Sequence, residues 1–199
     1  MEADGRTARW AGHREQRRAD FVEGAIAVLE REGPGVTIDQ IAAERGVTRQ
    51  ALYRQFADRA DLDRAIAARA ADLLLDVLLP KLELVGEVPA AARVVLDAYL
   101  DFVLDNLSLY RFVRSHEASA AEGVKGTVSS RVARLATEYL SATGVTAASA
   151  AGPFATGIVG LADAVISAWL DDPAELSRTE LVDQLVVMVQ GVVTAVLST

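Results

Sequence analysis

The stretch VTIDQIAAERGVTRQALYRQF, residues 36–56, decides the fold, because it contains two short helical patterns separated by one glycine. Thr37 and Gln40 have the spacing of a capping box, which starts a helix. Gly46 ends this helix, and Thr48 can cap the next one, which is expected to run to about residue 55. The stretch therefore predicts two short helices joined by a tight turn.

Three residues in this stretch have the spacing of a helix-turn-helix. Ala42, Gly46 and Leu52 stand at relative positions 0, +4 and +10. A small residue lets the two helices approach, glycine permits the turn, and an aliphatic side chain fills the core beneath the second helix. These residue types are common in helical proteins, so the spacing gains its weight from the surrounding sequence.

The rest of the chain shows helical periodicity and no strand-like alternation. Gly33-Pro34-Gly35 ends a first helix, and Asp58 can cap a helix that runs toward Pro80. The pattern predicts an all-α fold with about nine helices, beginning with a three-helix bundle that contains the helix-turn-helix. Further helices are expected at about 92–103, 107–115, 128–139, 154–169 and from 177 onward.

Charge is distributed unevenly along the chain. The net charge is −8, yet residues 1–70 contain 12 arginines and 12 acidic residues, so the whole acidic excess lies in residues 71–199. Every basic residue of the first part is arginine, whose forked guanidinium suits phosphate and guanine. The asymmetry suggests two regions with different partners.

Composition excludes several kinds of site. The chain has no cysteine, which excludes disulfides, thiolate metal sites and a cysteine nucleophile, and its two histidines cannot build a multi-histidine metal site. No P-loop, GxSxG or glycine-rich dinucleotide loop is present. Asp97 and Asp101 could serve acid–base chemistry, but Asp105 continues their row and favours a solvated helix face. We expect no enzyme activity, no cofactor and no metal.

The chain is expected to be a soluble cytoplasmic protein. Its first ten residues lack the apolar core of a signal peptide. The most apolar tracts, 150–170 and 185–197, are interrupted by polar residues such as Asp163 and Gln190, which argues against a membrane span.

The run at 36–56, followed by Arg59 and Leu62, resembles the TetR family of ligand-responsive bacterial transcription regulators. The resemblance is strong over about 17–66; beyond that it covers only the number and order of helices. Two positions depart from the family pattern: a small residue is usual where Gln50 stands, and a lysine is usual where Arg59 stands.

The resemblance implies that the helix 48–55 enters the major groove of DNA. Arg49 and Gln50 would contact base edges, since arginine suits guanine and glutamine suits adenine. The other DNA-binding candidates hold phosphates in this interpretation, with Arg54 able to do either. As alternatives, the arginines are solvated surface residues paired to neighbouring aspartates, and Tyr53 is partly core. The full set is Thr37, Thr48, Arg49, Gln50, Tyr53, Arg54 and Arg59.

The N-terminal residues 1–15 are expected to form a flexible basic arm ahead of a DNA-binding domain at 16–62. Such an arm contacts the minor groove or phosphates in some DNA-binding proteins. A disordered solubilising tail is the other interpretation. The arginines concerned, which continue into the first helix, are Arg6, Arg9, Arg14, Arg17 and Arg18.

For residues 63–199 the resemblance implies a helical domain that dimerises through its last two long helices. Those helices are apolar over a wide arc and need cover on several sides, which a homodimer or a central position in a monomer core would provide. Gly157 and Gly160 would permit close helix approach. The candidate interface residues are Phe154, Ile158, Leu161, Val165, Leu185, Met188, Val192 and Val196.

The same domain is implied to hold an effector pocket. Several aromatic residues gather in the fifth and sixth helices, which favours a largely apolar small molecule, although each aromatic alone could be ordinary core. The candidates are Tyr99, Phe102, Asn106, Tyr110, Phe112, His116 and Trp169.

The resemblance therefore implies a repressor that binds a palindromic double-stranded DNA operator as a homodimer and is released by a small apolar effector. Repression rather than activation follows from the resemblance alone. The alternative is an architectural or cell-division-associated DNA-binding protein of the same fold with no effector.

Overall fold

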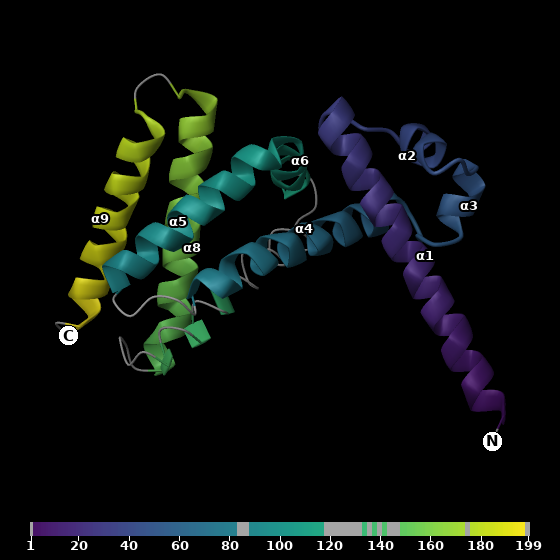
Figure 1. Ribbon diagram of the computed structural model, residues 1–199, viewed down its shortest axis with the longest axis horizontal. Helices are drawn as coiled ribbons and strands as arrows, with labels where there is room; N and C mark the ends of the chain where they lie inside the picture. The colour runs from purple at the N-terminus through teal and green to yellow at the C-terminus, as the bar shows by residue number, and fades with distance from the viewer. Residues whose placement is uncertain are drawn as a thin grey trace. The chain divides into compact units, whose positions relative to one another are not determined.

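The computed structural model describes residues 2–82, 88–117, 133–134, 137–138, 141–142, 148–173 and 176–197. Every regular element within these residues is helical, which confirms the all-α prediction (Figure 1). Of the helix expected at about 128–139, residues 133–134 and 137–138 are described and are helical; the rest lies outside the described residues. The eight helices of the described ranges are α1 (Glu2–Glu32), α2 (Ile38–Glu44), α3 (Arg49–Tyr53), α4 (Arg59–Leu82), α5 (Val88–Asp105), α6 (Leu107–Glu117), α8 (Ala148–Asp171) and α9 (Arg178–Leu197).

The chain divides into two compact units. The first unit contains α1, α2, α3, the part of α4 up to Ala70, and α6; the second contains α4 from Ala71 onward, α5, α8 and α9. The sequence predicts a boundary at 62/63 and assigns α6 to the second domain. The structure differs because α4 is one continuous helix shared by both units, so no linker marks the change.

Helix α1 begins earlier than expected. Residues 2–15, predicted to be a flexible arm, are part of α1 in the structure. Alanine, arginine and glutamate are good helix formers, and they extend the helix despite the cost of about 1 kcal/mol for each interior glycine. The end agrees with the prediction: Gly33 has φ +92° and its N–H donates to Leu29 O at 2.8 Å.

The first unit is built around the buried face of α1. Helix α1 packs against α2 and α6, and α2 packs against α3 (Figure 1). The rings of Phe21 and Phe56 meet edge to face, with centroids 6.4 Å apart and an interplanar angle of 81°. Leu29, Ile41 and Leu52 are fully buried with them. This core fixes the two short helices against α1.

Helix α6 joins this unit through both apolar and polar contacts. Leu109 and Phe112 are buried, and the Glu30 carboxylate of α1 accepts a hydrogen bond from the Leu109 N–H at 2.9 Å. That N–H lies in the first turn of α6, where helix amides lack internal partners and a negative charge is favourable. Glu30 therefore caps α6 from a neighbouring helix.

The second unit is centred on α9, which packs against both α5 and α8. Leu100, Ile166, Leu181 and Leu185 form its fully buried core. The predicted capping box at the start of α9 is present. Ser177 donates its backbone N–H and its hydroxyl to the Glu180 carboxylate at 2.9 and 2.7 Å, and these bonds lower the pKa of Glu180.

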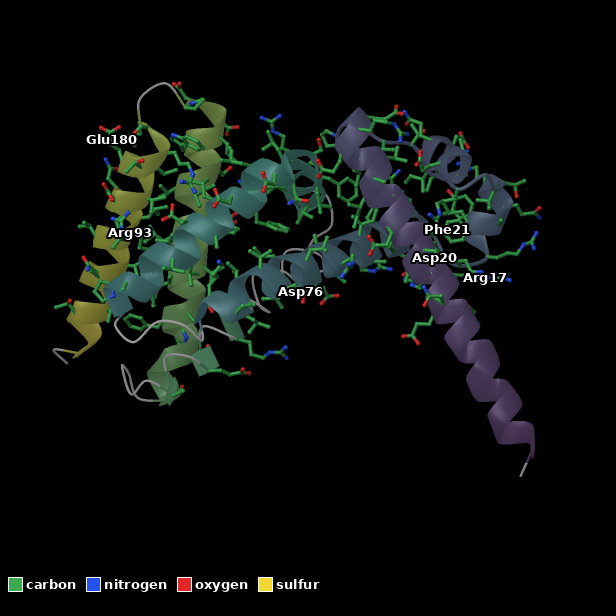
Figure 2. All side chains as sticks on the ribbon, viewed as in Figure 1. Arg17, Asp20, Phe21, Asp76, Arg93 and Glu180 are labelled. Carbon is green, nitrogen blue, oxygen red and sulfur yellow. The ribbon has the colours of Figure 1, made fainter. Side chains whose placement is uncertain are left out.

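Ion pairs also connect α5 to α9. Arg178 lies 2.6 Å from an Asp101 carboxylate oxygen and 3.2 Å from one of Asp97. Arg93 pairs with Asp183, and Figure 2 shows the labelled Arg93 side chain in this region. The aspartates of α5 thus serve helix packing as counter-ions.

Candidate nucleic-acid interface

The turn between α2 and α3 has the geometry predicted for it. Gly46 has φ +62°, a left-handed conformation that glycine adopts without strain. Its N–H donates to Ala43 O, and the Val47 N–H donates to Ala42 O, both at 3.0 Å. The buried Ala42 and Leu52 occupy the positions that a helix-turn-helix requires. The motif identified from spacing is therefore a structural helix-turn-helix.

Two threonines start the short helices as predicted. The Thr37 hydroxyl accepts from the Gln40 N–H at 3.3 Å, while the Gln40 side chain accepts from the Thr37 N–H at 2.8 Å. The Thr48 hydroxyl accepts from the Ala51 N–H at 3.3 Å. Both threonines are exposed. The Thr37 hydroxyl also donates its proton to Gln40 Oε1 at 2.8 Å. Helix α3 ends at Tyr53, slightly earlier than predicted.

The outward face of α3 carries four exposed side chains: Arg49, Gln50, Tyr53 and Arg54. The Arg49 guanidinium lies 5.6 Å from the centre of the Tyr53 ring and 3.6 Å from an Asp39 carboxylate oxygen of α2. A hydrogen bond to Tyr53 and then the charge of Asp39 raise the pKa of Arg49, so it stays cationic. Tyr53 is thus exposed, in agreement with a surface role.

Arg59 makes two contacts within the protein. Its Nε lies 2.7 Å from Asp63 Oδ1, and one terminal nitrogen donates to Val36 O at 3.1 Å. Asp63 is only 6% exposed. This arginine, predicted to hold a phosphate, therefore ties the start of α4 to Val36, the residue before the Thr37 cap of α2.

Arg18 makes a second set of contacts of the same kind, which sequence reasoning did not find. Its guanidinium donates to Gln55 O at 2.7 Å, pairs with both Asp61 carboxylate oxygens at 2.7 and 3.2 Å, and lies 4.3 Å from the centre of the Phe56 ring. The sequence signal was its position four residues before Val22 on the buried face of α1. A charged residue in an apolar row needs a partner.

Asp61 is the centre of this second set. Besides Arg18, it accepts a hydrogen bond from the Ala57 N–H at 3.0 Å, and its own N–H donates to Asp58 Oδ1 at 2.7 Å, which caps α4. The bond from Arg18 and then the bond from Ala57 lower the pKa of Asp61 to about 2. The carboxylate is therefore ionised at any physiological pH.

The predicted effector residues are divided between the two units. Tyr99, Phe102 and Trp169 lie in the second unit, where the Tyr99 hydroxyl donates to Asp163 Oδ1 at 3.2 Å and the Trp169 indole donates to Leu176 O at 2.7 Å. The others belong to the first unit: Asn106, Tyr110, Phe112 and His116. Of these, Phe112 is fully buried, and the His116 side chain lies outside the described residues.

The predicted dimer residues differ in exposure. Leu185 is fully buried within its own unit, whereas Met188 is 40% exposed. The Val196 side chain lies outside the described residues. The remaining candidates, which are half-buried, are Phe154, Ile158, Leu161, Val165 and Val192.

A separate row on α8 is more exposed than these candidates. It consists of the small residues Gly157, Gly160, Ala164 and Ala168, and a Cβ added at either glycine would meet no atom within 4 Å. By length and composition, Gly152–Asp171 is the one described segment apolar enough to cross a membrane, with a mean hydropathy of 1.5. The same apolar surface would suit a protein partner.

The fold and the exposed face of α3 define a helix-turn-helix DNA-binding protein. Residues 21–66 match the family model described as bacterial regulatory proteins, tetR family. An uncharacterized HTH-type transcriptional regulator of Mycobacterium tuberculosis, Rv0472c, is 30% identical over 192 residues, covering 94% of this chain and 82% of that protein. The chain belongs to the TetR family and is a DNA-binding transcriptional regulator.

Two further proteins show how far the likeness extends. The HTH-type transcriptional repressor LfrR of Mycolicibacterium smegmatis is 34% identical over 91 residues, 46% of this chain and 48% of its own length. The crystal structure of a tetR-family transcriptional regulator from Streptomyces coelicolor has a TM-score of 0.69 at 24% identity, covering 92% of this chain and 89% of that one. The structural likeness extends through both units and shows the shared fold.

Proposed function

We propose that this protein is a cytoplasmic, non-enzymatic repressor that binds a palindromic operator as a homodimer and is released by a small, largely apolar effector. The observation that carries the proposal is the exposed face of α3. Arg49, Gln50 and Arg54 point away from a core that Leu52 anchors, and these side-chain types match guanine, adenine and phosphate. Repression is further supported by the similarity to LfrR, which is a transcriptional repressor.

The uncovered surface of α8 and α9 supports the homodimer. The small-residue row of α8 lets another helix approach closely, and Val187 and Met188 of α9 are exposed apolar side chains. Two copies joined there would present two α3 helices to one DNA duplex. Successive major grooves on one face lie roughly 34–36 Å apart, which sets the distance between the two half-sites, and the two-fold symmetry of the dimer makes the operator a palindrome.

The aromatic residues of α5 support an apolar effector. Tyr99 and Phe102 pack against a cluster formed by Leu74, Leu78 and Ala98, and the Tyr99–Asp163 hydrogen bond adds one polar anchor to an apolar setting. A ligand that binds one conformation better than another shifts their populations and thereby changes DNA affinity.

The test is a titration of the full-length protein against DNA flanking its own gene, with non-specific competitor and at two salt concentrations. Saturable, competitor-resistant binding with two protein chains per site is the expected result. A screen of apolar small molecules on that complex then tests release. Binding that competitor abolishes would overturn the operator, and binding that no ligand weakens would favour an architectural DNA-binding protein instead.

A further inference from the structure

We propose that Arg18 is a positioning residue for sequence recognition: it sets the orientation of α3 by holding the carbonyl of Gln55, and it does so without touching DNA. The proposal rests on the operator binding proposed above. It assigns a role in specificity to a side chain of α1, outside the helix-turn-helix itself.

The contacts of Arg18 join three parts of the first unit. The guanidinium extends from α1 and donates a hydrogen bond to Gln55 O, in the backbone just after α3. It also pairs with Asp61 in the first turn of α4. It also stacks over Phe56, which follows Gln55 directly. The segment after α3 is thus tied to α1 and to α4 at one point.

These contacts occupy both terminal nitrogens of the guanidinium. One donates to Gln55 O at 2.7 Å and to Asp61 Oδ2 at 3.2 Å, and the other donates to Asp61 Oδ1 at 2.7 Å. Three of the five guanidinium N–H groups thus donate to protein acceptors, and the forked pairing is made with Asp61. Arg18 therefore serves the protein framework, in contrast to its exposed neighbour Arg17, labelled in Figure 2.

Arg59 makes a similar attachment at the N-terminal end of the helix-turn-helix. It donates to the carbonyl of Val36, which precedes the Thr37 cap of α2, and pairs with Asp63, two residues after Asp61. The helix-turn-helix is thus held at both ends by an arginine that binds a backbone carbonyl and a carboxylate of α4. Removing one of these attachments leaves α2 and α3 folded on their core but free to tilt.

A tilt of α3 affects specific and non-specific binding differently. Base-edge hydrogen bonds require side chains placed within a fraction of an ångström, whereas phosphate attraction is long-range and tolerant. Loss of Arg18 should therefore reduce affinity for the operator while leaving affinity for unrelated DNA nearly unchanged. Loss of an arginine that binds a phosphate would instead reduce the affinity for both DNAs alike.

The experiment begins by selecting sites from randomised double-stranded DNA with the full-length wild-type protein. Affinity for the selected site and for an unrelated duplex is then measured at several salt concentrations. The variants are Arg18→Ala, Arg18→Lys and Asp61→Asn. The matched control is Arg69→Ala, which removes another ion pair between α1 and α4, that with Glu23 at 2.6 Å, away from the helix-turn-helix. Circular dichroism and thermal unfolding verify that each variant is folded.

Arg18→Ala is expected to weaken binding to the selected site by roughly tenfold or more, because a charged hydrogen-bond network is lost. Binding to unrelated DNA should change by less than about twofold, with the same salt dependence. Asp61→Asn should act likewise, although removing a negative charge near DNA would otherwise strengthen binding. Lysine cannot span Gln55 O and both Asp61 oxygens, so Arg18→Lys should rescue little, and Arg69→Ala should preserve the ratio of the two affinities.

Three results would overturn the proposal. If Arg18→Ala weakens both DNAs equally and lowers the salt slope by about 0.9, the value for one neutralised phosphate, Arg18 is a phosphate ligand. If Asp61→Asn or Arg18→Lys keeps the wild-type ratio of affinities for the selected site and for unrelated DNA, the attachment stabilises the fold but does not affect specificity. These two variants decide between the interpretations if Arg18→Ala does not fold. If the wild-type protein selects no site at all, the proposed operator binding fails, and this role fails with it.

Discussion

The helix-turn-helix and the α8–α9 pair differ in how far their apolar side chains are buried. Leu52 and Phe56 are fully buried within the first unit, while the residues around them that face outward are polar or charged. On α8 and α9, apolar residues such as Val187 remain exposed, and a row of small residues faces open space. The first region is complete by itself, whereas the second presents a surface suited to another chain.

The largest effect is expected from a substitution in the buried core of the first unit. Phe56→Ala removes a fully buried ring that contacts Phe21 and Arg18, and should cost about 3–5 kcal/mol of unfolding free energy. Chemical denaturation followed by circular dichroism measures the loss. DNA binding should disappear while the oligomeric state is retained, because the second unit has its own core; loss of the oligomer as well would show that the two units fold as one.

A bulky side chain on α8 tests whether the second region is covered by another copy. Gly160→Leu adds volume where the protein itself leaves open space, so it should not disturb the unit, but it should weaken a close helix–helix dimer contact by about 1–3 kcal/mol. Sedimentation analysis measures the monomer fraction. Asp76→Leu, at an exposed position of α4, is the control, and equal dimerisation of both variants would remove this row from the interface.

Arg49→Ala tests the outward face of α3. Loss of a forked contact to a base should cost about 1–3 kcal/mol for the preferred base pair and flatten preference at one position of each half-site. Binding to a panel of single-base operator variants gives the profile. An unchanged profile would assign base reading to Gln50 and Arg54 alone.

Acid titration tests one ion pair of the first unit, that between Asp61 and Arg18. The folded-state pKa of Asp61 is lowered to about 2 from its usual value of 3.8, so this carboxylate stabilises the fold above about pH 4 and loses that contribution as the pH falls toward 2. Asp61→Asn should flatten the pH dependence of unfolding free energy in this window by at most about 1 kcal/mol, since the pair is partly exposed. A pH profile identical to wild type would contradict the assignment.

The smallest effect concerns Asp39, which lies 3.6 Å from Arg49 and competes with DNA for it. Asp39→Asn should strengthen binding to all sequences by about 1.4- to fivefold, the equivalent of an exposed ion pair worth about 0.2–1 kcal/mol. Fluorescence anisotropy with labelled duplexes can resolve this change. Weaker binding would mean that Asp39 orients Arg49 for the bases.

The difference between the two regions also explains what the sequence predicted well. The capping threonines, Gly46 and Leu52 act through neighbours a few residues away, so their spacing, together with the surrounding sequence, located the helix-turn-helix. Arg18 and Arg59 act through partners 37 and 23 residues away, Gln55 and Val36, and spacing carries no such information. The all-α class followed from periodicity throughout the chain.

The second region was harder to predict because burial there depends on which face of each helix meets its neighbours. Leu185 and Met188 both fit an apolar row, yet the first is fully buried within the unit and the second is exposed. The membership of α6 in the first unit likewise depends on Glu30, 79 residues from its partner Leu109. Periodicity gives the apolar face of a helix but not the surface that covers it.

The capping of α6 by Glu30 has a consequence for how a signal could travel. Because α6 belongs to the same unit as α3, the helix proposed to contact the bases, a molecule that contacts Tyr110 already touches that unit. Such a ligand would act on α6, which packs against α1, and α1 packs against α2 of the helix-turn-helix. A change at α6 would then reach the helix-turn-helix through contacts within the first unit alone.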